Sequence, residues 1–394
     1  MIYFSYFLVI LVLCFFRCKS YEGILLFVMT MAVFALSYPA GNDWIGYFQS
    51  YDCNVNFNCD PNAPTFEPGF NILISVLGVG GFIFYNCVIV LFNCLCLYFF
   101  SKNFENKAFV YLSMLSFMFW MLYIEAVRQS LAISILLIAL PYLYQGRFIK
   151  YCGLIFLAST FHITAIICLL FIIPKISKRF AKFSYTVALL FSVSFLAIPF
   201  IILNFVYALL NPSSLAYQKL SFYLSSDIYK PQLSAGVGSL FDVIFIMLII
   251  STCLFVIQRN LPEDRKGFDL IFPGVVLFIC FAIIIGKMMP VMTRIGWYGI
   301  PFIVIILNVY VSDSIYFKRN ENLSKHSLKT ILVYAFFASQ VARPLLYDHS
   351  RFGILNQSTI FSESEYLDDK GLMIKAKEKC NILHGMGLTF LCTI

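Results

Sequence analysis

Charged side chains are scarce in this sequence: Asp, Glu, Lys and Arg supply only 12% of its 394 residues, whereas 61% are hydrophobic. A soluble globular domain carries about 25% charged residues, so the composition excludes that class. The mean hydropathy of +0.85 leaves a surplus of apolar surface that lipid has to cover. Apolar runs of roughly 17–25 residues, each long enough to cross a hydrocarbon core of about 30 Å, recur along the chain. The sequence therefore predicts an all-α, polytopic transmembrane helical bundle.

Several catalytic signatures are also missing. The sequence has no P-loop, no Gly-rich dinucleotide-binding turn, no His-Glu-x-x-His metal site and no Asp-x-Asp pair for a metal-bound nucleotide sugar. Most of the 13 cysteines are scattered inside apolar runs, where cysteine behaves as a small hydrophobic residue. We therefore expect no metal and no cofactor. A transferase whose donor is already activated by a lipid pyrophosphate needs neither, because positioning, cationic stabilisation of the leaving group and one base suffice.

Lys and Arg at the ends of the apolar runs set the predicted topology. We expect about 10–12 spans, and ten are placed at residues 2–16, 22–38, 82–100, 108–124, 129–144, 184–209, 240–258, 268–286, 295–311 and 328–342. Most basic residues between spans then fall on one side, which the positive-inside rule makes cytoplasmic. The first loop on the other side, residues 39–68, holds four acidic residues and no Lys or Arg. The first run lacks a preceding basic residue and a small-residue cleavage site, so we expect it to be a retained span.

The predicted domain organisation is one membrane domain, residues 1–342, followed by a polar C-terminal tail, residues 343–394. Its long outer loops are residues 39–81 and 210–239. Cys53 and Cys59 in the first of these loops are compatible with a disulfide and with two free thiols.

Residues 150–173 carry basic residues at both ends, which favours a broken or re-entrant helix pair over a single span. The two short helices would meet near Thr160 to Thr164 and return to the cytoplasmic side, with His162 at the break. Non-helical backbone at membrane depth is tolerated only where it is buried in protein or lines a water-filled cavity. The pattern thus predicts that His162 stands at a break that is either buried in protein or beside such a cavity.

Ionisable residues near the outer ends of spans are candidate site residues, because charge at membrane depth is costly and usually faces a cavity or a partner. Arg128, Arg294 and Arg343 lie on the face where the positive-inside rule does not place them, and the planar fork of Arg suits phosphate or carboxylate. Glu125 precedes Arg128 by three residues, so the two could also form an interfacial ion pair if the helix continues. His162 is either a hydrogen-bonded packing residue or a base at a sugar hydroxyl.

Asp43, Trp44 and Tyr47 follow the second predicted span. They fit an interfacial turn in which Asp43 caps a short helix and the two rings anchor at the membrane surface. They fit a substrate-binding role equally well.

Four short motifs carry a family resemblance. They are Gly41-Asn42-Asp43-Trp44-Ile45-Gly46-Tyr47, Glu67-Pro68-Gly69-Phe70, Ala126-Val127-Arg128-Gln129-Ser130-Leu131-Ala132 and Phe161-His162-Ile163-Thr164-Ala165. With Arg294 at the start of a late span, the chain resembles the EpsG-like branch of Wzy-type bacterial polysaccharide polymerases. It departs from that pattern where Pro39-Ala40 precede the first motif, because similar proteins often carry an Arg before that Gly.

The resemblance implies a bacterial inner-membrane enzyme that builds O-antigen or a related surface polysaccharide. It would transfer a glycan chain from undecaprenyl pyrophosphate onto the non-reducing end of a lipid-linked repeat at the periplasmic face, with a chain-length regulator as a possible partner. Lipid-linked substrate and membrane lipid, not nucleic acid, are then the expected partners. The implied roles are base for His162 or Asp43, pyrophosphate binding for Arg128, Arg294 and Arg343, and substrate positioning for Trp44, Tyr47, Glu125 and Gln129. A lipid-linked oligosaccharide flippase or other transporter and an O-antigen ligase are the alternatives.

Overall fold

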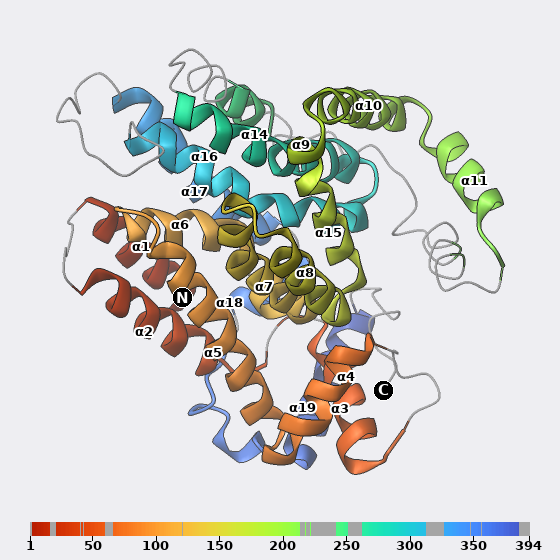
Figure 1. Ribbon diagram of the computed structural model, residues 1–394. Helices are drawn as coiled ribbons and strands as arrows, with labels where there is room; N and C mark the ends of the chain where they lie inside the picture. The colour runs from red at the N-terminus through yellow and green to blue at the C-terminus, as the bar shows by residue number, and fades with distance from the viewer. Residues whose placement is uncertain are drawn as a thin grey trace. The chain divides into compact units, whose positions relative to one another are not determined.

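The computed structural model confirms the predicted all-α fold (Figure 1). It describes residues 2–15, 21–39, 41, 43–59, 66–119, 121–212, 217, 221, 242–250, 262–312, 327–346, 348–355 and 357–385. Five helices among them are long and apolar enough to cross a membrane, and seven shorter apolar helices accompany them. The chain forms two compact units, one of Met1–Ile166 with Leu323–Ile394 and one of Ile167–Asn322. The predicted outer loop 210–239 lies almost entirely outside the described residues.

The first unit contains the N-terminal helices and the C-terminal segment. Its elements are α1 (Ile2–Phe15), α2 (Glu22–Ala35), α3 (Trp44–Asn56), α4 (Pro68–Leu77), η1 (Gly78–Gly80), α5 (Phe82–Ser101), α6 (Lys107–Met118), the π-helix η2 (Met121–Glu125), α7 (Val127–Tyr144), α8 (Phe148–Phe161), the start of η3 (Ile163–Ile172), α17 (Ser327–Ala342), η9 (Arg343–Leu346), α18 (Asp348–Leu355), η10 (Ser364–Tyr366) and α19 (Asp369–Gly385). Helix α7 packs along both α5 and α8.

A buried polar network joins α5 to α7. The Asn93 amide donates to Ser130 Oγ over 2.8 Å, and Ser134 Oγ donates to Asn93 Oδ1 over 2.8 Å. Polar side chains that bond across helices hold neighbours together where lipid provides no hydrophobic drive. The network fixes α7, and with it the segment that begins at Ala126 and Val127.

The N-terminus of α6 is capped twice. Asn106 accepts a 2.9 Å hydrogen bond from the Phe109 amide, and Glu22 at the start of α2 accepts a 2.7 Å bond from the Ala108 amide. A carboxylate is stabilised at a helix N-terminus by the free N–H groups and the helix dipole, which explains how Glu22 can be buried.

The second unit contains the remaining helices. They are α9 (Ile173–Ile176), α10 (Lys178–Ala197), α11 (Pro199–Leu209), the helical residues 242–250, α14 (Pro262–Leu277), the π-helix η4 (Phe278–Ile284), η5 (Ile285–Lys287), η6 (Pro290–Met292), α15 (Thr293–Gly296), η7 (Trp297–Gly299) and α16 (Ile300–Ser312). The single span expected at 184–209 is divided between α10 and α11. Ile198 interrupts it with φ −135° and ψ 53°, because the residue before Pro199 is kept out of the helical region.

The C-terminal segment is anchored to residues 37 and 38, which lie between α2 and the first predicted outer loop. Ser37 and Thr359 form an isolated antiparallel bridge, in which the Tyr38 amide donates to the Ser358 carbonyl over 3.1 Å. The Tyr38 hydroxyl also donates to the Tyr366 carbonyl over 2.9 Å. We call α3, α4 and α19 the cap. The proposed boundary at residue 342 between membrane domain and tail stays a prediction.

One hydrophobic cluster holds the cap together. Its buried members are Tyr38, Trp44, Ile45, Tyr47, Phe48, Tyr51, Phe70, Ile74, Phe82, Tyr85, Ile89, Leu131, Leu372, Ala376, Cys380 and Leu383. They come from the first outer loop, from α5 and α7, and from α19. The cap is therefore continuous with the helices that support it.

Candidate functional site

An ion pair between Glu67 and Arg128 lies at the centre of the candidate site. Glu67 precedes Pro68, the first residue of α4, and Arg128 is the second residue of α7. Only 14% of the Glu67 side chain and 18% of the Arg128 side chain are exposed. The other oxygen of Glu67, Oε1, accepts a 3.3 Å hydrogen bond from the Ile163 amide. Glu67 thus joins α7 to the segment that follows α8.

The break predicted at His162 is confirmed. Helix α8 ends at Phe161, and His162 adopts an extended conformation with φ −152° and ψ 111° before η3 begins. Its Nδ1 lies 2.6 Å from the Thr164 hydroxyl. Burial raises the pKa of the Glu67 carboxyl, but Arg128, backbone hydrogen bonds and His162 lower it more, so that this pKa lies below the ordinary value of 4.5. His162 and Arg128 therefore act on the same carboxylate.

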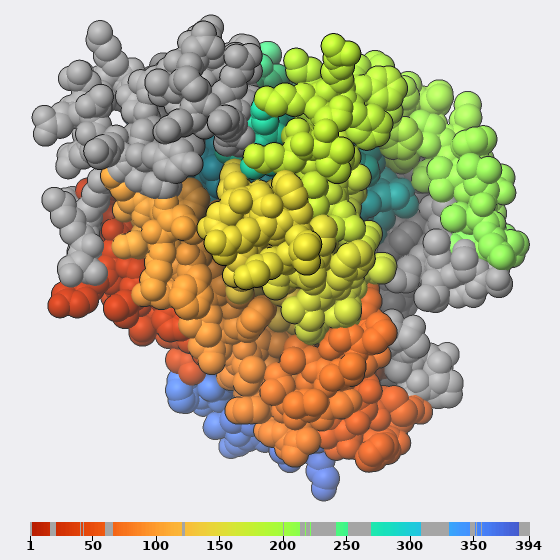
Figure 2. Space-filling view, in the orientation of Figure 1, coloured from red at the N-terminus to blue at the C-terminus, as the bar shows by residue number. Residues whose placement is uncertain are grey.

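Gly69 allows α4 to approach α8 closely. A Cβ atom on Gly69 would lie 2.3 Å from Thr160 Oγ1 and 2.8 Å from the Thr160 carbonyl oxygen. In Figure 2 the orange surface of α4 adjoins the yellow surface of α8, as their packing requires. This contact brings Glu67 within reach of the Ile163 amide.

Aromatic rings surround the Arg128 guanidinium. Its Cζ lies 4.1 Å from the Phe66 ring centroid and 6.0 Å from that of Phe70. Tyr47 packs on both rings, with centroids 5.5 Å and 5.6 Å away. Such faces attract a cation and keep water away from it. The Nε atom of Arg128 is buried and makes no hydrogen bond within the part of the chain that the structure describes.

Glu125 does not pair with Arg128, although their spacing allowed it. The π-helix η2 ends at Glu125, and Ala126, with φ −100° and ψ 58°, separates it from α7. Glu125 is buried beside Gly41, whose Cβ, if it had one, would lie 3.1 Å from Glu125 Cδ. Its carbonyl accepts a 3.1 Å hydrogen bond from the Tyr47 hydroxyl. Its carboxylate interacts electrostatically with Lys379 of α19.

Trp44 and Tyr47 are both buried and line a small pocket of about 60 Å³. Tyr38, Tyr123 and Val127 also line it. The volume suffices for a few water molecules. Asp43 stands at the N-cap position of α3, as the capping interpretation predicts, but its side chain makes no capping hydrogen bond.

The other predicted site residues are distributed over both units. Gln129 is buried in α7, and Arg343 begins η9 and is half-buried. Arg294 lies in α15 of the second unit and is described with that unit. The roles assigned to these residues stay predictions.

Sequence reasoning placed Glu67 in a motif but gave it no role, and it missed Lys379 and a second buried pair. In the second unit, Lys287 at the end of η5 forms an ion pair with Asp242. A charged residue inside a predicted span indicates such a pair. Asp242 lies in the predicted span 240–258, so it is the residue from which the pair could have been predicted.

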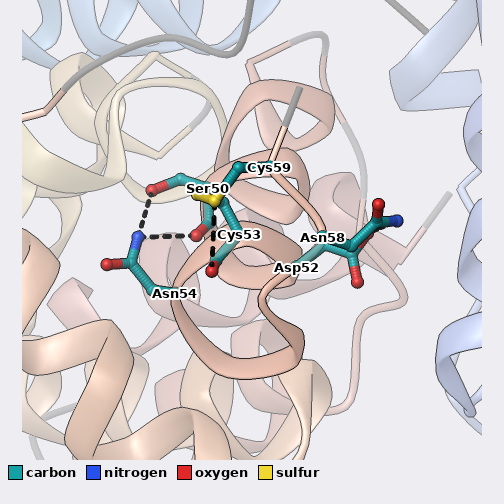
Figure 3. Close-up of a disulfide and its surroundings, with 6 residues drawn as sticks. All are labelled: Ser50, Asp52, Cys53, Asn54, Asn58 and Cys59. Carbon is teal, nitrogen blue, oxygen red and sulfur yellow. Dashed lines mark hydrogen bonds between the residues drawn. A yellow bond between two sulfur atoms is a disulfide. The ribbon is translucent and has the colours of Figure 1, made fainter. Parts of the chain in front are cut away.

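The first outer loop contains a disulfide between Cys53 and Cys59 (Figure 3). Nearby, the Asn58 amide donates to Asp52 Oδ2 over 2.8 Å. Cys380 in α19 is disulfide-bonded as well. The free cysteines among the described residues lie in helices predicted to be in the membrane: Cys14, Cys87, Cys94, Cys96, Cys152, Cys168 and Cys280. Of the described disulfide cysteines, Cys53 and Cys380 therefore lie in helices of the cap, and Cys59 lies in the loop that follows α3.

The four motifs that carried the resemblance meet in this site. A family model for the EpsG family matches residues 20–349, which is most of the chain. The chain belongs to the EpsG family. It is accordingly a multi-pass membrane protein of the polysaccharide polymerase type. Neither curated proteins nor solved structures gave a match to this chain.

Proposed function

We propose that this EpsG-family protein polymerises a surface polysaccharide, such as O-antigen, from lipid-linked repeats. The donor is a glycan chain on undecaprenyl pyrophosphate, and the acceptor is the non-reducing end of a new lipid-linked repeat. The observation that supports this most is that four separate motifs meet around one ion pair. Glu67 and Arg128 form the pair, His162 acts on the Glu67 carboxylate, and Tyr47 packs on the two rings beside the Arg128 guanidinium.

The transfer needs a leaving-group site and a base. The acceptor hydroxyl attacks the anomeric carbon, the bond from that carbon to the phosphate oxygen breaks, and the electron pair leaves with the lipid pyrophosphate. Arg128 is suited to stabilise that charge, because its guanidinium has five N–H donors and Glu67 occupies only part of them. Arg343, which belongs to the same unit, is a further candidate for the same group.

His162 is the better supported of the two candidate bases. It stands at a helix break, half-buried, close enough to Glu67 to affect its ionisation. Its Nδ1 meets Thr164, so Nε2 would take the proton of the acceptor hydroxyl. Asp43 stands at the start of α3 and remains the alternative base.

Two features of the first outer loop support a periplasmic site for the reaction. The loop 39–68 carries acidic residues without Lys or Arg, and it contains the disulfide between Cys53 and Cys59. Both features are typical of the periplasmic side of a bacterial inner membrane. We therefore assign the site to that face.

The test is the length of surface glycan in cells that lack the gene, complemented with wild type, Arg128→Ala or Arg147→Ala. Arg147 is exposed and lies next to the start of α8, at the predicted cytoplasmic end, so its variant is the matched control. We expect single-repeat product in the deletion and with Arg128→Ala, and long chains with the other two. Loss of all surface glycan in the deletion, including the single-repeat form, would point to a flippase or a ligase instead.

A further inference from the structure

The small pocket beside Trp44 and Tyr47 has uncharged walls. They come mainly from α1, α2, α3, α5 and η2, with the first residue of α7. Most of the lining side chains are aromatic or aliphatic, and the rings of Phe34 and Tyr123 stack there with centroids 5.2 Å apart. No Lys, Arg, Asp or Glu is among the lining residues that the structure describes. A carboxylate or phosphate would be desolvated there without a counter-charge, so the pocket suits a neutral group.

Asn86 of α5 is a polar residue of this wall that the fold does not explain. It is half-buried and lies one turn inside α5, at the end of the helix that borders the first predicted outer loop. Its side-chain amide makes no hydrogen bond within the described part of the chain. Asn93 of the same helix differs, because its amide is bonded to Ser130 and Ser134. A polar residue in a membrane helix is costly and usually faces a cavity or a partner, and Asn86 lines a cavity.

Tyr123 brings a second polar group to the pocket wall. It is 6% exposed, and its hydroxyl makes no hydrogen bond to any of the described residues. Buried polar groups normally have a partner in the protein, in water or in a ligand. Asn86 offers two N–H donors and one carbonyl acceptor, and the Tyr123 hydroxyl can donate or accept. A few polar groups on an apolar, concave wall are typical of a small-molecule site.

The volume of the pocket, about 60 Å³, limits what can enter it. One water molecule needs about 10–15 Å³ of such a cavity, so there is room for roughly four to six non-hydrogen atoms. A whole sugar ring is too large, but a substituent of the ring is not. An acetamido group, –NH–CO–CH₃, falls in that range and is neutral. Its amide complements the amide of Asn86, and its methyl group suits the aromatic walls.

The pocket adjoins the candidate site. Tyr47 lines the pocket and also packs on Phe66 and Phe70. Those two rings lie beside the Arg128 guanidinium. Val127, which precedes Arg128, lines the pocket as well. A sugar whose substituent occupies the pocket would therefore lie next to the arginine that we assign to the pyrophosphate. All of these residues belong to the first unit.

We propose that this pocket binds the acetamido group of an N-acetylated sugar in the lipid-linked repeat, and that Asn86 is a specificity residue that hydrogen-bonds to that group. The identity of the glycan rests on the function proposed above. Binding of the sugar itself can be measured without polymerisation.

Saturation-transfer NMR on the purified protein in detergent tests this binding. The probes are the methyl glycosides of N-acetylglucosamine and N-acetylgalactosamine, and methyl glucoside, which lacks the acetamido group, is the control ligand. We expect the acetyl methyl protons to receive the strongest saturation from wild type. Asn86→Leu should weaken binding of an N-acetylated probe about tenfold, because the amide of the ligand loses its partner. Asn103→Leu, the same substitution at an exposed residue just after α5, should bind the probes as wild type does.

Ala35→Leu tests the pocket without removing a polar group. Ala35 is a buried residue of the wall, and the larger side chain would fill the space that the acetyl group needs. We expect this variant to lose the acetyl methyl signal, and thermal unfolding checks that it is folded. Equal saturation of methyl glucoside and the N-acetylated probes by wild type overturns the proposal. Acetyl saturation that is unchanged in Asn86→Leu overturns it too.

Polymerisation of the native lipid-linked repeat separates this inference from the proposed function. We expect Asn86→Leu to raise KM for the repeat about tenfold, and Asn103→Leu to leave it unchanged. If wild type makes no polymer, the proposed function fails, whereas the NMR result still decides what the pocket binds. If wild type is active but Asn86→Leu has the same KM, or if the isolated repeat contains no acetamido sugar, only the assignment of the pocket fails.

Discussion

Removing the Arg128 side chain should cost both stability and activity, and the two losses can be separated. Breaking a fully buried ion pair costs about 3–5 kcal/mol, and an exposed pair is worth less than about 1 kcal/mol. Glu67 and Arg128 are 14% and 18% exposed, so they lie nearer the buried limit. We expect Arg128→Met to lower the free energy of unfolding by about 2–3 kcal/mol, because it leaves the Glu67 carboxylate without its cation.

The double variant Glu67→Gln/Arg128→Met should recover most of that stability, because no net charge then remains buried at the pair. Thermal unfolding of the purified protein in detergent measures this recovery. Polymerisation should not recover with it, because the cation that stabilises the leaving pyrophosphate is still absent. Arg128→Lys provides the third comparison: it keeps the charge but lacks the planar fork, so we expect a folded protein with shortened glycan.

The pH dependence of stability provides an independent check. The folded pKa of Glu67 lies below its ordinary value of 4.5, so the contribution of the pair to stability is fully present above that value and is lost as pH falls through the folded pKa. The difference in unfolding temperature between wild type and Glu67→Gln should therefore be constant near neutral pH and shrink on acidification below about 4.5. Full polymerisation by the double variant would refute the assignment of Arg128 to the leaving group. A stability difference that grows on acidification would refute the electrostatic argument.

Two further predictions follow from the packing of the cap. Gly69→Ala should strongly reduce polymerisation, because the new Cβ would meet both the side chain and the backbone of Thr160 and displace Glu67. The control is Gly153→Ala in α8, where a Cβ would have nothing within 4 Å, so we expect this variant to be neutral or slightly more stable. Glycan length and thermal unfolding are measured for both variants. Replacing Cys53 and Cys59 by Ser should lower the stability of the purified protein by about 2 kcal/mol, as expected for so short a closed loop. The variant should also be less sensitive to a reductant than wild type, because the disulfide of Cys380 is then the one described disulfide cysteine left to reduce. An unchanged unfolding temperature on reduction of wild type would contradict the second of these.

The sequence was most informative where a single physical constraint dominates. Lipid requires long apolar helices, so composition predicted the fold class. A break in an apolar run between basic flanks predicted the interruption at His162, and the structure shows extended backbone there. Pro199 indicated the division between α10 and α11, because proline lacks a backbone N–H and keeps the preceding residue out of the helical conformation. The apolar run continues across Pro199, however, and it favoured the prediction of one span.

Partners across long sequence separations could not be predicted. Glu125 and Arg128 are three residues apart, and on a continuous helix they would face each other. A π-helix and a break at Ala126 direct them to Lys379 and Glu67 instead. Those choices depend on how α4 and α19 pack, which hydrophobic periodicity does not specify. For the same reason the polar tail gave no sign that it anchors to the cap.

The described site pairs the Arg128 guanidinium with a carboxylate, that of Glu67. A ligand with one negative charge would only replace the carboxylate that the cation already has. Its binding would also have to offset the free-energy cost of leaving that protein carboxylate buried without its cation. A lipid pyrophosphate presents several anionic oxygens at once, and these can accept hydrogen bonds from several N–H groups of the Arg128 guanidinium together. The paired arrangement would therefore favour the multiply charged substrate over the abundant singly charged anions of its surroundings, since specificity is a difference between two affinities.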